Sequence, residues 1–257
     1  MLALTRAIPD RFVDALAATP PEPPIDVALA RRQHAAYRAA LAALGAEVVM
    51  LATDEACPDA CFIEDTAVVA GGVALITRPG APSRQAEGAA VAAVLSARMD
   101  VAFMAAPATL DGGDCLRLGR TLYVGRSART NAAGIARAAE VFGARGLRVV
   151  AIDLPPAVLH LKCVCAPLGD DRVLLARGAL PDGVFAPAAP VWVPADETYA
   201  ANAVAIGAGV IIADGFPRTR DALERAGFAA HPVATTEVRK ADGSLTCLSI
   251  LVPVPRR

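Results

Sequence analysis

The sequence has no long apolar run and no excess of charge of either sign. Every apolar stretch is interrupted before the roughly 20 residues that a membrane-spanning helix needs. The 25 basic and 26 acidic residues leave a formal net charge of −1, which argues against a dedicated nucleic-acid binder. We therefore expect a soluble protein that binds neither membranes nor nucleic acids.

A secretory leader and a disulfide framework are also missing. The first ten residues hold two charges and a proline instead of a basic region followed by an apolar stretch. The six cysteines are scattered through a chain of 257 residues, which is long enough to fold without disulfides. Reduced thiols and a cytoplasmic location are the resulting expectations.

What the sequence does have is a repeated pattern of two apolar strands joined by a glycine turn. Hydrophobic residues make up 55% of the chain, enough to bury a large core and to exclude disorder. Four segments show the pattern, with turns at Gly71, Gly119, Gly169 and Gly207, and a last unit begins at Leu245. The four segments are residues 66–78, 115–126, 163–177 and 203–214.

Helical stretches fall between these units. Residues 33–44 have helical spacing of apolar groups and are followed by a predicted strand at residues 46–51. Residues 131–142 and 221–226 are also predicted to be helical. A unit that recurs about every 40 to 50 residues indicates a repeat architecture, and an ordinary α/β fold with irregular strand order is the alternative. In a closed ring, we expect the residues that end each strand to meet at a central axis.

One histidine and one cysteine stand out as candidate catalytic residues. His34 opens an alanine-rich helix and His231 precedes a proline in a predicted loop, as is typical of surface or structural residues. His160 instead lies between an apolar run and a predicted strand, where it is the only well-placed base for a thiol. Cys247 follows a polar turn and enters the last strand, so its alternative is a buried core thiol.

Acidic residues gather in two short segments. Asp59, Glu64 and Asp65 lie at the mouth of a predicted buried strand, where carboxylates are costly to desolvate without a partner. A cationic ligand would supply that partner. Asp111 and Asp114 surround two glycines, which let the backbone approach closely and could aim a carboxylate at an imidazole. Solvated acids in turns are the alternative for both segments.

Two arginines occupy equivalent places in successive units. Arg84 follows the first hairpin and Arg129 follows the second. An arginine side chain suits a bidentate grip on a carboxylate, and a surface arginine at a helix start is the alternative. Together with the acids, the two arginines fit a zwitterionic substrate that has a cationic end and a carboxylate end.

Six motifs in chain order closely resemble those of the dimethylarginine dimethylaminohydrolases. They are FIED at residues 62–65, ITRPG at 76–80 with the following Arg84, TLDGGD at 109–114, SARTN at 127–131, HLK at 160–162 and DGSLTC at 242–247. The match spans nearly the whole chain. The resemblance implies an α/β fold, the five-bladed α/β propeller of the guanidino-group modifying enzymes. It further implies one catalytic domain over residues 1–257, in which the first unit closes the ring with the last.

The resemblance also implies the catalytic roles. Cys247 is the nucleophile, His160 is the general acid and base, and Asp111 is the carboxylate that orients His160. Some relatives carry a glutamate where Asp111 stands. Because aspartate is shorter by one carbon, we expect a longer or water-bridged contact between Asp111 and His160.

Substrate contacts are carried over in the same way. By the resemblance, Glu64 and Asp65 hold the guanidinium with Asp59 nearby, while Arg84 and Arg129 hold the α-carboxylate and neighbouring polar groups.

Three further positions complete the implied substrate site. Leu16 looks like a residue of the family's flexible lid, and backbone at Ala241 and Asp242 would meet the α-amino group. Ala241 is smaller than the branched residue expected there, so we expect a looser wall.

The implied reaction is hydrolysis of asymmetric dimethylarginine or monomethylarginine to citrulline and dimethylamine or methylamine. It proceeds through a covalent thiouronium on the cysteine, and it needs no metal and no organic cofactor. The expected partner is the small-molecule substrate, and the sequence leaves the oligomeric state open, with a homodimer compatible.

Three other readings are kept. The first is an arginine or agmatine deiminase of the same superfamily, although agmatine lacks the carboxylate that the two arginines would bind. The second is a non-catalytic protein that binds arginine derivatives. The third is a redox or metal thiol protein, which the cysteine spacing disfavours because Cys57 and Cys61 have no matching second pair in Cys163 and Cys165.

Overall fold

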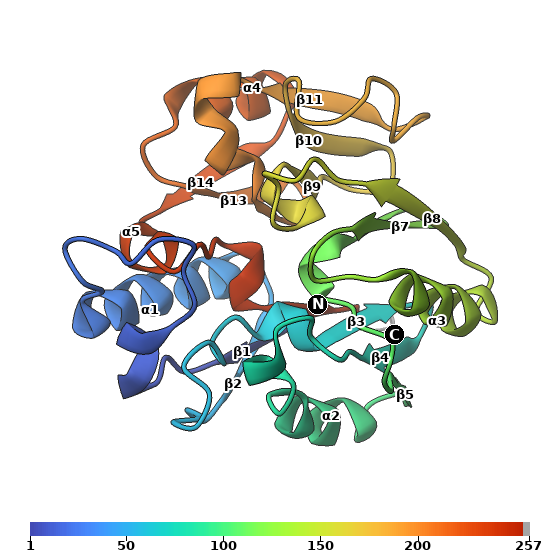
Figure 1. The fold of residues 1–257 in the computed structure, drawn as a ribbon. Helices are drawn as coiled ribbons and strands as arrows, with labels where there is room; N and C mark the ends of the chain where they lie inside the picture. Colours follow the sequence, from blue (N-terminus) through green and yellow to red (C-terminus); the bar gives the residue numbers. More distant parts are fainter. Residues whose placement is uncertain (254–257) are drawn as a thin grey trace.

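Five small β-sheets surround a central axis in the computed structural model, which describes residues 1–253 (Figure 1). This confirms the predicted five-bladed α/β propeller. The sheets, in the spatial order of their strands, are β15 (Ile250–Val252), β1 (Leu2–Arg6) and β2 (Glu47–Leu51); β3 (Ala67–Ala70), β4 (Val73–Ile76) and β5 (Asp100–Phe103); β6 (Cys115–Leu118), β7 (Thr121–Arg126) and β8 (Arg148–Asp153); β9 (Cys165–Pro167), β10 (Arg172–Ala176) and β11 (Ala189–Val193); and β12 (Val204–Ile206), β13 (Gly209–Ala213) and β14 (Ala229–Val233).

All five sheets share one plan. The middle strand pairs antiparallel with the first strand and parallel with the third. An antiparallel pair can be joined by a tight turn, whereas a parallel pair needs a longer crossover. Four helices supply crossovers: α1 (Val27–Ala43), α2 (Gly88–Ser96), α3 (Ala132–Gly143) and α4 (Pro217–Arg225). Residues 177–188 join β10 to β11 through turns, and the short α5 (Thr236–Arg239) follows β14.

The ring closes by pairing the two ends of the described chain. Strand β1 pairs antiparallel with β15, in a register that places Leu2 opposite Val252 and Leu4 opposite Ile250. The first sheet therefore draws strands from both ends, as the propeller prediction requires. The predicted last unit at Leu245 supplies one strand instead of a complete hairpin.

The hairpins occur where the sequence predicted them, and so does β2, which was predicted at residues 46–51. The third strands of the other four sheets were not predicted. The turn glycines Gly71, Gly119 and Gly207 have φ values of 58°, 54° and 60°, a region that other residues rarely adopt. The sequence pattern missed β5, β8, β11 and β14, which are edge strands in which most residues are exposed or half-buried. One consequence is that His231, predicted in a loop, lies in β14.

Two helices begin earlier than predicted. Helix α1 begins at Val27, where the side chain of Asp26 accepts a hydrogen bond from the backbone N–H of Leu29 at 2.9 Å. Helix α4 begins at Pro217, a residue that is favoured in the first helical turn because its missing N–H is not needed there.

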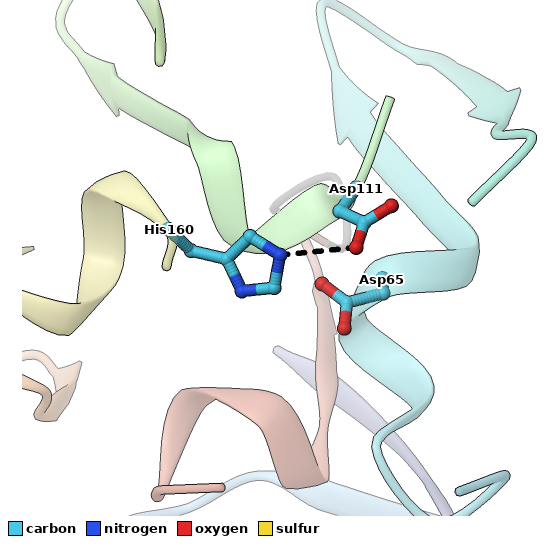
Figure 2. Close-up of side chains that lie close together, drawn as sticks. All are labelled: Asp65, Asp111 and His160. Atoms are coloured by element: carbon cyan, nitrogen blue, oxygen red, sulfur yellow. Dashed lines mark hydrogen bonds and ion pairs between the residues drawn. The ribbon is translucent and has the colours of Figure 1, made fainter. Parts of the chain in front are cut away.

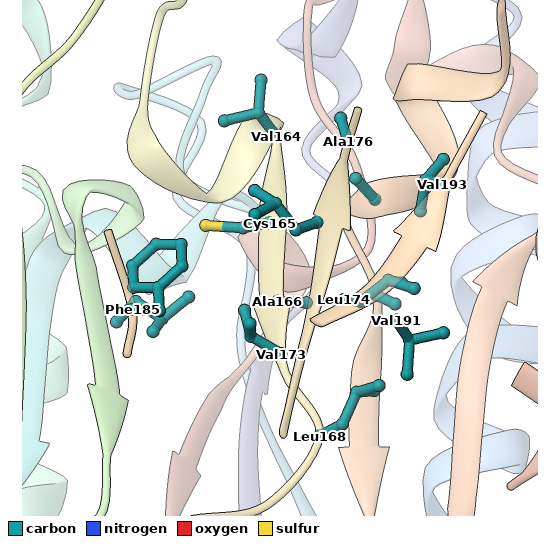
Figure 3. Close-up of a cluster of buried hydrophobic side chains, with 14 of the residues drawn as sticks. Val164, Cys165, Ala166, Leu168, Val173, Leu174, Ala176, Phe185, Val191 and Val193 are labelled. Carbon is teal, nitrogen blue, oxygen red and sulfur yellow. The ribbon is translucent and has the colours of Figure 1, made fainter. Parts of the chain in front are cut away.

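The middle strands carry the core. Every residue of β1, β4 and β13 is buried, so these strands are nearly continuous apolar runs. Figure 3 shows one such cluster, where Cys165, Leu174 and Val193 of neighbouring strands are fully buried. Burying a side chain of this size contributes about 1.5 to 3 kcal/mol, which makes the sheets a rigid support for the residues near the axis.

None of the helices within residues 1–253 has the length and apolar character needed to cross a membrane.

Candidate active site

A short 3-10 helix precedes the first strand of every sheet. These five segments, called the axial helices below, are Ile63–Thr66, Gly112–Asp114, Leu161–Cys163, Ala195–Ala201 and Thr246–Leu248. Each of the first three axial helices contacts the next one along the chain, and the first also contacts the last. The predicted catalytic residues lie on or just before these helices, and not at strand ends as the sequence pattern suggested. Each of these residues is followed in the chain by the first strand of a sheet, and the sheet fixes the position of its side chain near the axis.

One cavity of about 210 Å³ brings together nine of the eleven predicted site residues. They are Leu16, Asp59, Asp65, Arg84, Arg129, His160, Ala241, Asp242 and Cys247, and they are joined there by Ala17, Ala18, Phe62, Leu159 and Gly243. Asp111 lies behind His160, fully buried, and Glu64 lines a different cavity.

His160 and Asp111 are in direct contact. The Nε2 atom of His160 lies 3.0 Å from Oδ2 of Asp111 (Figure 2). The other carboxylate oxygen accepts a hydrogen bond from the backbone N–H of Gly80 at 2.7 Å, so Asp111 is fixed. The expected longer or water-bridged contact is therefore wrong. The shorter aspartate reaches because Gly113 has no side chain: a Cβ there would lie 2.9 Å from Nδ1 of the imidazole.

The surroundings keep His160 protonated. Burial alone would lower its pKa, but the negative charges of Asp65, Asp111 and Asp114 outweigh burial and raise the pKa to about 9. The imidazole is therefore an acid at neutral pH. Asp114 is itself held by the backbone N–H of Leu161, which donates to it at 3.0 Å.

The same surroundings keep the thiol of Cys247 neutral. Burial raises its pKa well above the ordinary value, and the carboxylates of Asp65 and Glu64 raise it further. A cation in the cavity would act in the opposite direction and favour the thiolate.

Asp65 faces the cavity as a fixed anion. Its Oδ2 atom accepts from Arg84 at 2.6 Å and its Oδ1 atom accepts from the backbone N–H of Gly113 at 2.9 Å. Burial would raise its pKa, but the positive charges of His160 and Arg84 lower it to about 2. Asp65 is therefore ionised throughout the neutral range.

Arg84 is committed to this internal network. Besides Asp65, it donates to both carboxylate oxygens of Glu87, at 3.0 and 2.9 Å, and to the carbonyl of Phe62 at 2.8 Å. Its side chain is only 5% exposed. The expectation that Arg84 holds a substrate carboxylate finds little support in this geometry, because four of its five N–H groups already have acceptors.

Arg129 is placed differently. It lines the cavity and is half-buried, and its guanidinium makes no hydrogen bond or ion pair with any residue within 1–253. Of the two predicted arginines, Arg129 is the one with donors available to a ligand.

Glu64 is not brought together with Asp65. Its carboxylate pairs with Lys162 and accepts from the hydroxyl of Thr246 at 2.7 Å. Neighbouring residues on a 3-10 helix point in different directions, so Glu64 faces a second cavity of about 200 Å³ on the other side of the axial helices. The expectation that both acids face one ligand is not met.

Leu16 and its neighbours cover the cavity. The backbone N–H of Leu16 donates to Asp59 at 3.0 Å, and that of Ala18 donates to Asp242 at 2.6 Å. Leu16 is 41% exposed, so the segment is a cover held by two carboxylates and not part of the core. Asp242 has a φ of 54°, which places a non-glycine residue in the left-handed region at a cost of about 1 kcal/mol or more.

One group of potential metal ligands coincides with this site. Among residues 1–253, Asp65, Asp111 and His160 have ligand atoms that lie within 4.8 Å of one another. Asp65 is engaged by Arg84, and Asp111 by His160 and Gly80. These contacts account for both carboxylates without a metal ion.

The comparisons with known proteins agree on one family. A family model described as N,N dimethylarginine dimethylhydrolase, eukaryotic, matches residues 22–184. The chain is also 39% identical over 250 residues to the N(G),N(G)-dimethylarginine dimethylaminohydrolase of Streptomyces coelicolor, a match that covers 96% of this chain and 95% of the relative. The chain belongs to the dimethylarginine dimethylaminohydrolase family. The resemblance read from the six motifs is thereby confirmed.

Another member of the dimethylarginine dimethylaminohydrolase family supports the fold. The chain is 35% identical to the Pseudomonas aeruginosa enzyme, over 88% of this chain and 89% of that one. A solved structure of that enzyme, a cysteine-to-serine mutant complexed with citrulline, superposes with a TM-score of 0.92 at 33% identity and covers 96% of this chain and 97% of that chain.

Sequence reasoning missed the residues that hold the cavity residues and the segment of Cys247 in place. Glu87 holds Arg84, Lys162 holds Glu64, and Asn202 bonds to Thr246 beside the cysteine. Of these three residues, only Lys162 lies within one of the six motifs, HLK. Glu87 carried no signal because an acid three residues after an arginine is common on any exposed helix.

The hydrogen bond from Ala18 to Asp242 holds the segment that covers the cavity. Asp242→Asn should raise KM by about three- to tenfold, because the neutral amide is a weaker acceptor for the N–H of Ala18. Asparagine tolerates a positive φ, so the unfolding temperature should change little. Limited proteolysis within residues 15–20 should also become faster. Unchanged proteolysis and KM would show that Asp242 does not hold the cover.

Proposed function

We propose that the chain hydrolyses Nω-methylated arginines to citrulline and dimethylamine or methylamine. The observation that carries the proposal is one cavity lined by a fixed carboxylate, Asp65, a thiol, Cys247, and a protonated imidazole, His160. The guanidinium of Arg129, which has no partner among the residues that the structure describes, completes a site for a ligand with a cationic end and a carboxylate end. The names of the relatives support the same reaction.

Binding prepares the nucleophile. The guanidinium lies against Asp65 with Asp59 nearby, and the α-carboxylate is bound by Arg129. Because the positive charge of the substrate offsets the acids that raise the pKa of Cys247, the thiol loses its proton to water when the substrate is bound. Catalysis therefore depends on the cationic form of the substrate.

The chemistry then takes two steps. The Sγ atom attacks the guanidinium carbon, and His160 gives its proton to the methylated nitrogen, so that the carbon–nitrogen bond breaks and dimethylamine leaves a covalent thiouronium. The now neutral His160 takes a proton from water, whose oxygen adds to the same carbon. The carbon–sulfur bond then breaks, the proton of the added hydroxyl group passes to solvent, citrulline is released and the thiolate is regenerated. Asp111 holds Nε2 of His160 throughout.

Parallel assays test the proposal. The purified protein should be incubated with asymmetric dimethylarginine, monomethylarginine, arginine and agmatine, and citrulline or carbamoylputrescine should be measured together with the released amine. Methylated arginines should give citrulline and the corresponding amine at the highest kcat/KM. Faster turnover of arginine or agmatine with ammonia release would favour a deiminase. Binding without any product would favour a non-catalytic arginine-derivative binder.

The two arginines are predicted to behave differently. Arg129→Ala should remove a charge-assisted contact worth roughly 1.5 to 3 kcal/mol and lower kcat/KM by about one to two decades. The loss should appear mainly in KM, because the contact is remote from the reacting carbon. Decarboxylated dimethylarginine should react poorly with the parent and be little affected by Arg129→Ala.

Arg84→Ala is the comparison variant. It removes the partner of two buried acids, Asp65 and Glu87, so it should lower the unfolding temperature and impair both substrates equally. Equal losses on both substrates for Arg129→Ala as well would mean that Arg129 does not bind the carboxylate.

A further inference from the structure

Hydrogen bonds join the five axial helices into a closed ring. Each helix is bonded to the next, directly or through the residue that follows it, and the last is bonded back to the first. The bonds run from Gly113 N–H to Asp65 Oδ1 (2.9 Å), from Leu161 N–H to Asp114 Oδ1 (3.0 Å), from Asn202 Nδ2 to Lys162 O (2.9 Å), from Thr246 N–H to Asn202 Oδ1 (2.9 Å) and from Thr246 Oγ1 to Glu64 Oε2 (2.7 Å).

Asn202 makes two of these five connections. Its Oδ1 accepts from the backbone N–H of Thr246, and its Nδ2 donates to the carbonyl of Lys162. Nδ2 also lies 3.1 Å from the hydroxyl oxygen of Thr246, which in turn donates to Glu64. A rotated amide would place its N–H group against the N–H of Thr246 and its oxygen against the carbonyl of Lys162. The amide orientation is thus determined by its partners, and all of its donors are used.

The place of Asn202 in the chain separates it from the catalytic cavity. It is 3% exposed, it precedes β12, and it does not line the cavity that holds Cys247. It nevertheless touches the residue directly before the nucleophile, Thr246, and the residue two positions after His160, Lys162. Asn202 thus joins the segment of the nucleophile to the segment of the acid through a single amide. The Glu64 carboxylate, which pairs with Lys162 and accepts from Thr246, joins the same two segments by side chains only, whereas Asn202 bonds to the backbone of both.

We propose that Asn202 is a positioning residue that sets the distance between Cys247 and His160, an inference that rests on the proposed function. Covalent attack and proton transfer act on the same guanidinium carbon and its nitrogen, so the thiol and the imidazole must keep one relative placement. A displacement of about 1 Å can cost on the order of a hundredfold in rate. Cys247, Asp65, Asp111 and His160 each precede the first strand of one of the other four sheets. The sheet of β12 to β14 contributes the amide of Asn202, which holds the segment of Cys247 in place.

The expected result for Asn202→Ala is a loss in kcat and not in binding. We expect kcat on dimethylarginine to fall by about ten- to a hundredfold. KM and the inhibition constant of citrulline should stay within about threefold of the parent values, because Asp65 and Arg129 keep their places. All three constants should be measured at a temperature well below the unfolding transition of the variant.

A buried carboxylate on the axial helix that precedes Asn202 provides the control. Glu197 is 6% exposed and accepts from the N–H and the hydroxyl of Thr219, both at 2.7 Å, so it ties the axial helix Ala195–Ala201 to α4 without touching the ring. Glu197→Gln should lower the unfolding temperature and leave kcat within about twofold. A loss of kcat in Glu197→Gln equal to that in Asn202→Ala would show that any loosening of this helix impairs the enzyme.

If Asn202→Ala does not fold, the same constants should be measured on the near-isosteric variant Asn202→Asp. It keeps an acceptor for Thr246, loses both donors and places a carboxylate oxygen against the carbonyl of Lys162, so a kcat loss at least as large is expected. The positioning role is overturned if kcat is unchanged, or if KM and the citrulline constant rise as much as kcat falls. A parent protein that binds dimethylarginine without releasing citrulline would contradict the proposed function instead, and the two failures are therefore distinct.

Discussion

Cys247→Ser should abolish citrulline formation while leaving the fold intact. The resonance-stabilised guanidinium is a poor electrophile, and an alcohol does not provide the accessible anion that a thiol provides. We expect kcat to fall by at least about a thousandfold, with an unfolding temperature within a few degrees of the parent. The change is nearly isosteric and Cys247 is only half-buried, so little packing is lost.

Cys163→Ser is the matched control for this substitution. Cys163 is also half-buried and also lies on an axial helix, but it does not line the cavity. Turnover by Cys163→Ser should stay within about threefold of the parent, since no reacting group is changed. Substantial citrulline formation by Cys247→Ser would refute the assignment of the nucleophile, and a selective loss in Cys163→Ser would move that assignment.

His160→Gly should stop the reaction after attack. The departure of the amine and the hydrolysis of the thiouronium both need the proton that His160 moves, and such proton transfer contributes about 10² to 10⁴ in rate. Intact-protein mass spectrometry should therefore detect a covalent adduct on Cys247 after mixing with a substrate analogue that has a good leaving group. Citrulline release from dimethylarginine should fall by that same factor.

The pH dependence of the parent checks the same assignment. Because His160 has a pKa of about 9, its acidic form is lost as the pH rises through that value, and kcat should fall there.

The raised pKa also affects stability: the contribution of His160 to the free energy of unfolding is full below the ordinary pKa of about 6.5 and is lost as the pH rises through about 9. His231→Ala, which changes a histidine outside the cavity, should alter neither profile. Normal turnover by His160→Gly would make His160 a structural residue.

The family could be read from the sequence because its evidence is local. Glycine turns, apolar strands and short motifs such as TLDGGD are set by neighbouring residues, so the four hairpins and the residues Cys247, His160 and Asp111 could be named before any fold was known. A repeated unit that cannot bury its apolar face alone also predicts a ring of such units.

Local evidence could not predict the roles of side chains whose partners are distant in the chain. Arg84 appeared to be a carboxylate binder, but its donors are taken by Asp65 and Glu87. Glu64 and Asp65 are adjacent in sequence, yet they face different cavities because successive side chains of their axial helix point in different directions.

By itself, then, the sequence determined the repeating hairpins, the family and the set of chemical groups, because turn glycines, strand patterns and motifs depend on residues close together in the chain. The tertiary structure decided how the ring closes through β1 and β15, where the edge strands lie, and which charges are paired. It also decided the protonation of His160 and Cys247, since a pKa depends on burial and on the charges nearby in space. Asn202 belongs to this second group: its three bonds join segments 40 and 44 residues away, which only the closed ring brings together.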